Sequence, residues 1–196
     1  MGKRKGKMSN RLIGFMGAPS TGKTMLAGAM KEYAFTHGGI STDVCTEYAR
    51  EFVFRHGFPK HVYTQYRITS RQLEREDLLL KGNSEFIFTD SPVWLGWVYG
   101  VLKLTPDCDA EVSMAISDMY ESFVMNQINR YHKVFHVKVE APEDDGCRDM
   151  EGNKLITELI DGFILSHKHL LPIITIPPEY NSPESRKQFV WNNLLN

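Results

Sequence analysis

The stretch Gly17-Ala18-Pro19-Ser20-Thr21-Gly22-Lys23-Thr24 decides the fold of this chain. It has the spacing Gly-x4-Gly-Lys-Thr, in which the glycines let the backbone turn abruptly and approach a ligand closely. An apolar run over 11–16 precedes it and a helical pattern over 22–37 follows it. Backbone amides at such a helix start bind phosphate. We therefore expect all eight residues to bind ATP, with Lys23 at its β- and γ-phosphates and the Thr24 hydroxyl on Mg²⁺.

The composition is that of a globular domain. The chain has 196 residues, 42% of them hydrophobic and 24% charged, and a net charge of −1. The average charge gives no reason to expect a nucleic acid or a membrane as partner, and no apolar run approaches the ~20 residues of a membrane span. Cys45, Cys108 and Cys147 are odd in number and widely spaced, which fits neither a disulfide framework nor a zinc site. We expect a cytoplasmic protein.

The order of the patterns predicts one domain. Residues 1–10 are basic and are expected to be a disordered arm, whereas 11–196 are expected to form a single P-loop domain. Strand patterns alternate with helical ones, which favours a three-layer α/β fold with a five-stranded parallel sheet. The predicted strands are 11–16, 43–46, 85–89, 133–139 and 173–176, the fourth of them near an edge. The predicted helices are 22–37, 47–55, 63–81, 93–104, 109–131, 154–169 and 185–195, with a loop over 141–152.

Polar residues that follow the strands are the candidate catalytic groups, because ligands of wound sheets bind beyond the carboxyl ends of the strands. Asp90 ends the third strand, where its carboxylate can hold Mg²⁺ or cap the helix that begins near Pro92. Glu47 follows the second strand and can bind an acceptor or take the proton of its hydroxyl. Arg50, about one turn further on, can reach the acceptor or a phosphate. Weak surface ion pairs are the alternative for Glu47 and Arg50.

Two candidates lie beyond these strand ends. Arg148 stands in a charged loop that can close over the triphosphate and neutralise charge during transfer, or that can be an ordinary surface loop. Trp94 follows the Asp90 corner and can stack on a substrate ring, although packing in the core is the commoner use of such a residue.

The helix predicted over 63–81 carries a basic stripe. Arg67, Arg71 and Arg75 recur at every fourth residue, which is typical of a solvated face or of a surface that contacts phosphates. Gln65 and Gln72 on the same helix can hydrogen-bond a base or an amide, and Gln72 is a predicted substrate contact.

Several of these segments together resemble a known family. They are GAPSTGKT, 46–51 (TEYARE), the helix with Gln65 and Gln72, the Thr89-Asp90 corner and Asp145-Gly146-x-Arg148. The combination resembles the nicotinamide riboside kinase domain of bifunctional NAD-biosynthesis regulators, and it is similar to the wider group of small P-loop ATPase and kinase domains. The resemblance implies ATP-dependent transfer to a hydroxyl of a nucleoside-like acceptor. It carries phosphate binding to Lys23 and Thr24, acceptor binding to Glu47 and Arg50, metal binding to Asp90 and a lid role to Arg148.

The leading hypothesis is therefore a kinase with ATP and Mg²⁺ as cofactors. Its expected catalytic residues are Lys23, Glu47, Asp90 and Arg148, and its expected substrate contacts are Glu47, Arg50, Gln72, Asp90 and Trp94. The acceptor can be a nucleoside, a nucleotide or a modified base. One alternative is a kinase for hydroxymethylated pyrimidines or other hydroxyls in DNA. Another is an NTPase switch that acts through partners without a phosphorylated acceptor. The sequence leaves open whether the protein forms a homo-oligomer.

Overall fold

The computed structural model describes residues 10–104, 109–138 and 150–194. Their five strands form one parallel sheet with the order β2-β3-β1-β4-β5. The strands are β1 Arg11–Met16, β2 Thr42–Cys45, β3 Phe86–Thr89, β4 Lys133–His136 and β5 Ile173–Thr175. The sheet is the five-stranded parallel sheet that the sequence predicts. Of the predicted basic arm 1–10, residues 1–9 lie outside the described residues.

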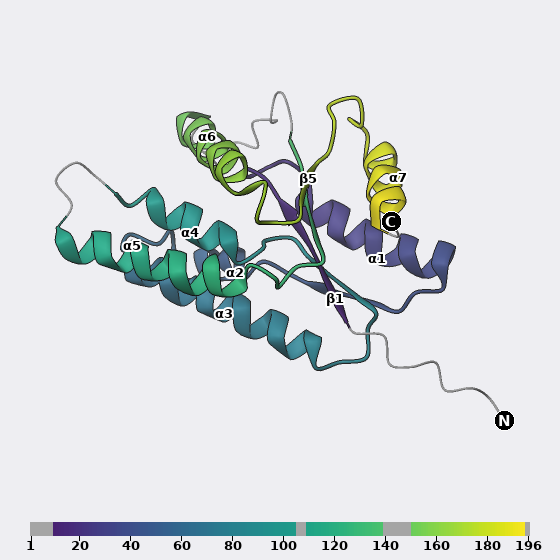
Figure 1. Ribbon diagram of the computed structural model, residues 1–196, viewed down its shortest axis with the longest axis horizontal. Coiled ribbons are helices and arrows are strands. Elements are labelled where there is room, and N and C mark those ends of the chain that lie inside the picture. Colours follow the sequence, from purple (N-terminus) through teal and green to yellow (C-terminus); the bar gives the residue numbers. More distant parts are fainter. Residues whose placement is uncertain (1–9, 105–108, 139–149, 195–196) are drawn as a thin grey trace.

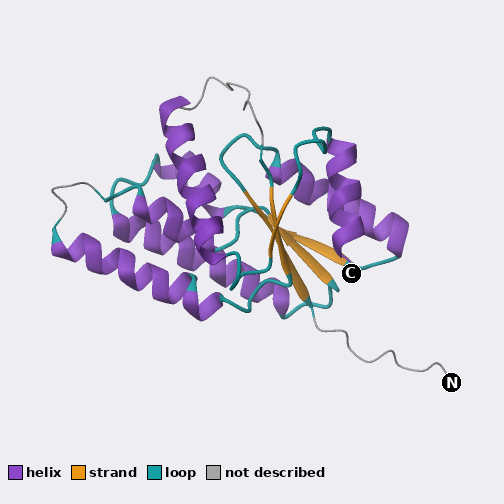
Figure 2. Cartoon of the chain, turned by 45° about the horizontal axis from the view of Figure 1, so that its top comes forward, coloured by secondary structure: helices purple, strands orange, loops and turns teal. Residues whose placement is uncertain are grey.

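Helices cover both faces of the sheet, so the fold has three layers (Figures 1 and 2). The helices are α1 Lys23–Gly38, α2 Tyr48–His56, α3 Val62–Leu80, α4 Trp94–Val101, α5 Ala110–Phe123, α6 Met150–His167 and α7 Pro183–Leu194. One face of the sheet packs on α1 and α7, through Ile13 and Phe15 among others. The other face packs on α4 and α6, through Leu12 and Met16. The alternation along β1 follows from the period of two in a strand.

Two predicted elements differ from the structure. The helix expected over 109–131 ends at Phe123 and is followed by a short 3-10 turn, Met125–Gln127. Its apolar pattern continues because Val124 and Tyr131 are buried in the core after the helix has ended. The strand expected to be half-exposed or near an edge, β4, lies next to the edge strand β5, but Val134, Phe135 and His136 are all buried, so it is not half-exposed.

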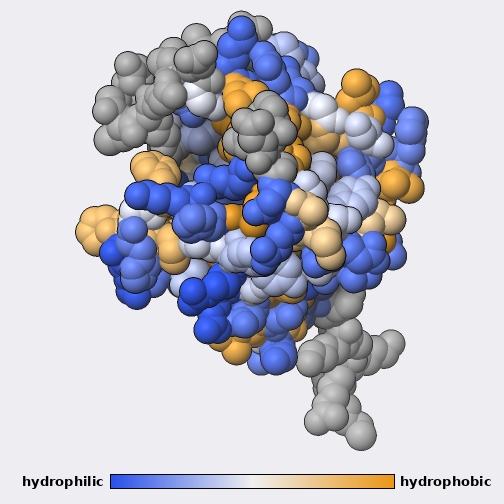
Figure 3. Space-filling model, turned by 90° about the vertical axis from the view of Figure 1, so that its left-hand side faces the viewer, coloured by the Kyte–Doolittle hydropathy of each residue, from blue (hydrophilic) through white to orange (hydrophobic). Residues whose placement is uncertain are grey.

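The outer surface of the helical layer at the left of Figure 1 is mostly hydrophilic. Figure 3 shows this side, where hydrophobic side chains occur in small separate groups between polar ones. Among the described residues, none of the helices has both the length and the apolar content needed to span a membrane.

Candidate functional site

The loop between β1 and α1 has the backbone geometry of a phosphate-binding loop. Gly17 lies so close to the backbone of β4 that a Cβ atom there would be 2.4 Å from the carbonyl oxygen of Val137. Gly22 has φ +85° and Ser20 has φ +62°, both in the left-handed region that residues other than glycine rarely adopt. The loop thus holds a backbone shape that leaves its amides at the amino end of α1, where the helix dipole favours an anion.

Lys23 and Thr24 stand at the start of α1 in contact with the other predicted groups. The amine of Lys23 donates to the carbonyl oxygen of Ala18 at 2.6 Å, so it lies across the loop. The guanidinium of Arg50, from α2, donates to the hydroxyl oxygen of Thr24 at 3.1 Å. Thr24 in turn hydrogen-bonds the carboxylate of Asp90. The structure therefore brings four of the predicted residues, from three different parts of the chain, to one place.

Asp90 is a buried carboxylate with an incomplete set of partners. It is 2% exposed, and its Oδ1 atom has no hydrogen-bond partner among the described residues. Burial raises the pKa of Asp90, although its hydrogen bond to Thr24 and the charges of Arg50 and Lys23 oppose this rise. It does not cap α4, whose N-cap is Val93. A buried carboxylate oxygen without a partner next to a hydroxyl is a donor set that suits a hard divalent cation such as Mg²⁺.

Arg186, on α7, also holds the phosphate loop, and sequence reasoning missed it. Its Nη1 donates to the carbonyl oxygen of Thr21 at 3.3 Å and its Nε donates to that of Tyr180 at 3.0 Å. The sequence carries no clear signal for it, since Arg186 lies within α7 and not directly at the carboxyl end of β5.

A cavity of about 20 Å³ lies next to Asp90, between α2, α3 and the start of α4. Cys45 and Thr89 are paired neighbours in the sheet, so Glu47 and Asp90 follow adjacent strand ends. The cavity combines polar and apolar side chains, and its volume is far below that of sites that enclose a small molecule. It is lined by Glu47, Ala49, Gln65, Ile68, Thr69, Gln72, Ser91, Pro92, Val93, Gly96 and Tyr99.

The two glutamines of α3 differ in what their amides contact. The Oε1 atom of Gln72 accepts from the backbone N–H of Tyr48 at 2.8 Å, and its Nε2 lies 3.4 Å from Cys45 Sγ and 3.3 Å from Thr89 Oγ1. Gln72 therefore joins α2 and α3 to the sheet. Gln65 is 5% exposed and lines the same cavity, and its amide makes no hydrogen bond within the described part of the chain. Of the two, Gln65 has the amide that is available to a ligand.

Other predicted residues lie elsewhere. Trp94 is fully buried, packs against Tyr131 and Phe163, and is absent from the cavity lining, so it is a core residue in this structure. Arg75 pairs with Glu51 and lies over the ring of Tyr48. Arg71 pairs with Glu74 at 2.5 Å, and Arg67 is exposed. Arg148 lies outside the described residues.

His136 ends β4 beneath the site. It is 4% exposed, and its Nε2 is 3.8 Å from a carboxylate oxygen of Asp161 on α6. Burial above all, opposed by Asp161 and helped by the charges of Lys138 and Lys23, lowers the pKa of His136 to about 4. The imidazole ring of His136 is therefore neutral at pH 7.

This pKa predicts a loss of stability in acid. A group whose pKa is depressed by folding stabilises the protein above its unfolded value, about 6.5, and that contribution disappears as the pH falls toward 4. For His136 the full loss is on the order of 3 kcal/mol. We expect His136→Gln to flatten the unfolding free energy between pH 6.5 and 4 in urea titrations, whereas His56→Gln, at the exposed end of α2, leaves the slope unchanged. Equal slopes for wild type and His136→Gln would contradict this assignment.

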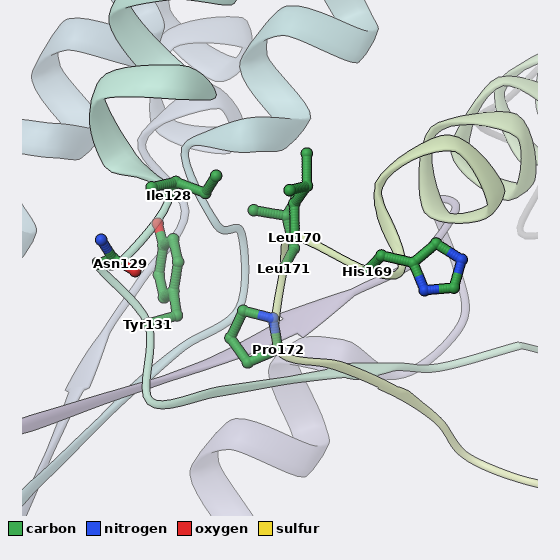
Figure 4. Close-up of a pocket in the computed structure, with 7 residues that line it drawn as sticks. All are labelled: Ile128, Asn129, Tyr131, His169, Leu170, Leu171 and Pro172. Atoms are coloured by element: carbon green, nitrogen blue, oxygen red, sulfur yellow. The ribbon is translucent and has the colours of Figure 1, made fainter.

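A larger depression lies at the opposite end of the sheet (Figure 4). It is open and is lined by Ile128, Asn129, Tyr131, His169, Leu170, Leu171 and Pro172. The backbone N–H of Val134 bonds the carbonyl oxygen of Pro172, which places the depression at the amino ends of the strands. The phosphate loop follows the carboxyl end of β1, so this depression is not part of the candidate site.

The sheet order, the loop and the buried Asp90 define an α/β P-loop nucleotide-binding domain. A family profile described as "AAA domain" matches residues 12–178, and the chain belongs to this P-loop family. A comparison with curated protein sequences found no match.

Solved structures of similar fold include three nucleotide- or nucleoside-related proteins. NadR protein in complex with NAD and AMP-PNP is 15% identical with a TM-score of 0.72, over 94% of this chain and 49% of that one, so this chain spans about half of NadR. Deoxyadenosine kinase from M. mycoides is 13% identical with a TM-score of 0.66, over 93% and 98% of the two chains. Thymidylate kinase from Ehrlichia chaffeensis is 14% identical with a TM-score of 0.64, over 96% and 99%. These likenesses establish the fold.

Proposed function

We propose that this protein is an ATP-dependent kinase that transfers the γ-phosphoryl group to a hydroxyl of a nucleoside-like acceptor. The observation that carries the proposal is the position of the cavity containing Gln65 and Glu47 directly beside Asp90 and the phosphate loop. The similar folds of deoxyadenosine kinase and thymidylate kinase support the same class of reaction.

In this proposal, the chain's own residues position the reactants and stabilise charge. The loop amides and Lys23 bind the phosphates, while Thr24 and Asp90 hold Mg²⁺, which neutralises charge on the phosphate oxygens. Glu47 takes the proton of the acceptor hydroxyl as that oxygen bonds to the γ-phosphorus. The bond from phosphorus to the β-phosphate oxygen breaks and ADP leaves. Arg50 stands by Thr24, within the same charge cluster, and Arg148 is proposed to close over the triphosphate.

Gln65 is proposed to recognise the acceptor through the base or amide group. The side-chain amide has N–H donors and an acceptor oxygen. It can therefore form two hydrogen bonds with a planar heterocycle that has an acceptor and a donor side by side at its edge. Leaving such a partner unpaired in a buried site costs ~1–3 kcal/mol.

We accordingly expect Gln65→Leu to raise the KM for the acceptor by about 10- to 100-fold and to leave the KM for ATP within about twofold of wild type. Steady-state kinetics with each substrate varied in turn measure both constants. Gln188→Leu, on the exposed surface of α7, is the control. A rise in both constants would indicate a damaged fold, and no rise in either would remove Gln65 from the site.

A second candidate acceptor, a hydroxyl in a single-stranded nucleic acid, is favoured by the surface that 48–71 form beside the cavity. This segment contains five lysine or arginine residues and one acid, although the whole chain has a net charge of −1. Phe54 and Phe58 within it are 91% and 71% exposed. Exposed aromatic rings among basic side chains are typical of surfaces on which single-stranded bases stack.

One experiment tests both candidates. ATP labelled in the γ-phosphate is offered with free nucleosides, nucleotides and oligonucleotides that contain modified pyrimidines, and the labelled product is identified. Label on a small molecule at a rate insensitive to salt supports the first candidate. Label on an oligonucleotide, with a steep loss at higher salt, supports the second. Hydrolysis of ATP without any labelled acceptor would overturn the kinase proposal in favour of an NTPase switch.

A further inference from the structure

The segment Ser91–Gly96, which follows β3 and includes the first residues of α4, forms one wall of the cavity through Ser91, Pro92, Val93 and Gly96. It is closely packed on two sides. A Cβ atom on Gly14 of β1 would lie 2.6 Å from Pro92, and one on Gly96 would lie 2.1 Å from Thr69 of α3. Such packing leaves little room for the segment to shift toward either neighbour.

A third contact holds this segment through a backbone amide. The first amides of a helix lack partners within it, and no side chain of its own N-cap residue caps α4. The N–H of Val93 instead donates to the hydroxyl oxygen of Tyr131 at 2.7 Å, across 38 positions of sequence. Figure 4 shows the ring of Tyr131 upright, with the hydroxyl at the end directed away from Pro172.

The hydroxyl of Tyr131 is itself fixed by a buried ion pair. It donates to the carboxylate of Glu76, whose oxygens are 3.0 and 3.1 Å away, and Arg130 Nε donates to the same carboxylate at 2.7 Å. The Glu76 side chain is 0% exposed and that of Arg130 is 9% exposed. Arg130 also pairs with Asp77 at 2.8 Å. These contacts leave the phenol oxygen one orientation, with its lone pair toward Val93.

Stability alone is a weak explanation for this arrangement. The desolvation of two buried charges offsets much of their attraction, and well-packed apolar residues are often as stabilising as a buried ion pair. What the ion pair does supply is a fixed direction for one hydroxyl, and that hydroxyl contacts the cavity wall.

We propose that Tyr131, held by Glu76 and Arg130, is a positioning residue that fixes Ser91–Gly96 as the wall of the acceptor cavity. The assignment of this cavity to the acceptor rests on the function proposed above. Tyr131 touches no reactant, since it acts only through the amide of Val93.

The test is Tyr131→Phe, which removes one hydroxyl and keeps the ring. Its matched control is Tyr120→Phe, because the Tyr120 hydroxyl is also hydrogen-bonded, 2.8 Å from His167 Nε2, but makes no described hydrogen bond to 91–96. We expect Tyr131→Phe to raise the acceptor KM by about tenfold, with the ATP KM within about twofold of wild type. Tyr120→Phe should change neither constant, even where urea unfolding shows a comparable loss of stability. Equal acceptor KM values for the two variants would overturn the proposal.

Amide hydrogen exchange tests the positioning role of Tyr131 independently of the proposed kinase reaction. If wild type phosphorylates no acceptor, the kinase assignment fails, and exchange in peptides that cover 91–96 still decides the role of Tyr131. Faster exchange there in Tyr131→Phe and in Glu76→Gln, but not in Tyr120→Phe, supports positioning. Unchanged exchange in Tyr131→Phe, or an equal increase in Tyr120→Phe, overturns it.

Discussion

Replacement of Lys23 by alanine is expected to lower kcat for phosphoryl transfer by about 10²–10³-fold. The amine that lies across the loop is the one positive side chain that the loop itself supplies, and charge on the phosphate oxygens must be neutralised as the phosphoryl group moves. Rapid-quench or steady-state assays with labelled ATP measure the loss. The fold should survive, because alanine is compatible with the first position of α1 and leaves the loop backbone unchanged.

Lys31→Ala is the control for this variant. Lys31 is on the same helix, half exposed, and its ion pair with Asp43 is 3.9 Å long, so its removal should alter neither kcat nor the unfolding midpoint. A Lys23→Ala protein that turned over ATP at the wild-type rate would refute the assignment of the phosphate loop. If it lost activity and also unfolded at much lower urea concentration, the loss could not be assigned to catalysis.

Asp90→Asn is expected to change activity and stability in opposite directions. Burial raises the pKa of Asp90 in the folded protein, so the ionised carboxylate is less favourable there than in the unfolded chain. An amide of the same shape removes that charge, and we expect the unfolding free energy at pH 7 to rise by on the order of 1 kcal/mol. We expect kcat to fall by at least about 10²-fold, because the remaining group is a poor ligand for Mg²⁺.

The direction of the stability change distinguishes a metal ligand from a structural hydrogen-bonding group. For a raised pKa, the destabilisation by the ionised form grows as the pH increases through the folded value, so wild type and Asp90→Asn should converge in acid. Urea titrations at several pH values test this, and activity at increasing Mg²⁺ tests the loss of a ligand. Asp43→Asn, on β2 and 43% exposed, is the control. Lower stability of Asp90→Asn at pH 7 would mean that Asp90 is a structural hydrogen-bonding group.

The sequence predicts the fold well where local pattern and tertiary environment agree. The run 11–16 is apolar, ends at a glycine loop and is β1 with the same bounds. Prediction fails where a buried apolar residue lies in a turn or loop beyond the helix whose apolar pattern it continues. Val124 and Tyr131 continue the apolar pattern of α5, but the chain has already left the helix in order to enter β4. A single sequence does not distinguish these cases, because burial in a turn and burial on a helix face select the same residue types.

For the candidate site, too, some features could be predicted from the sequence and others could not. That Lys23, Thr24, Arg50 and Asp90 lie together was predictable, because the phosphate-loop spacing places the first two and the rule about strand ends places the other two. The difference between Gln65 and Gln72 was not predictable, since both lie on the buried face of α3 and only their partners separate them.

The contact of Arg186 with Thr21 has a consequence for how the protein is made. The phosphate loop is translated before α7, which carries Arg186, one of its supports. A nascent chain still lacking α7 has the loop sequence but neither this guanidinium nor the packing of α7 on α1. Nucleotide should therefore protect a chain that includes α7 from proteolysis more than ribosome-bound intermediates that still lack it.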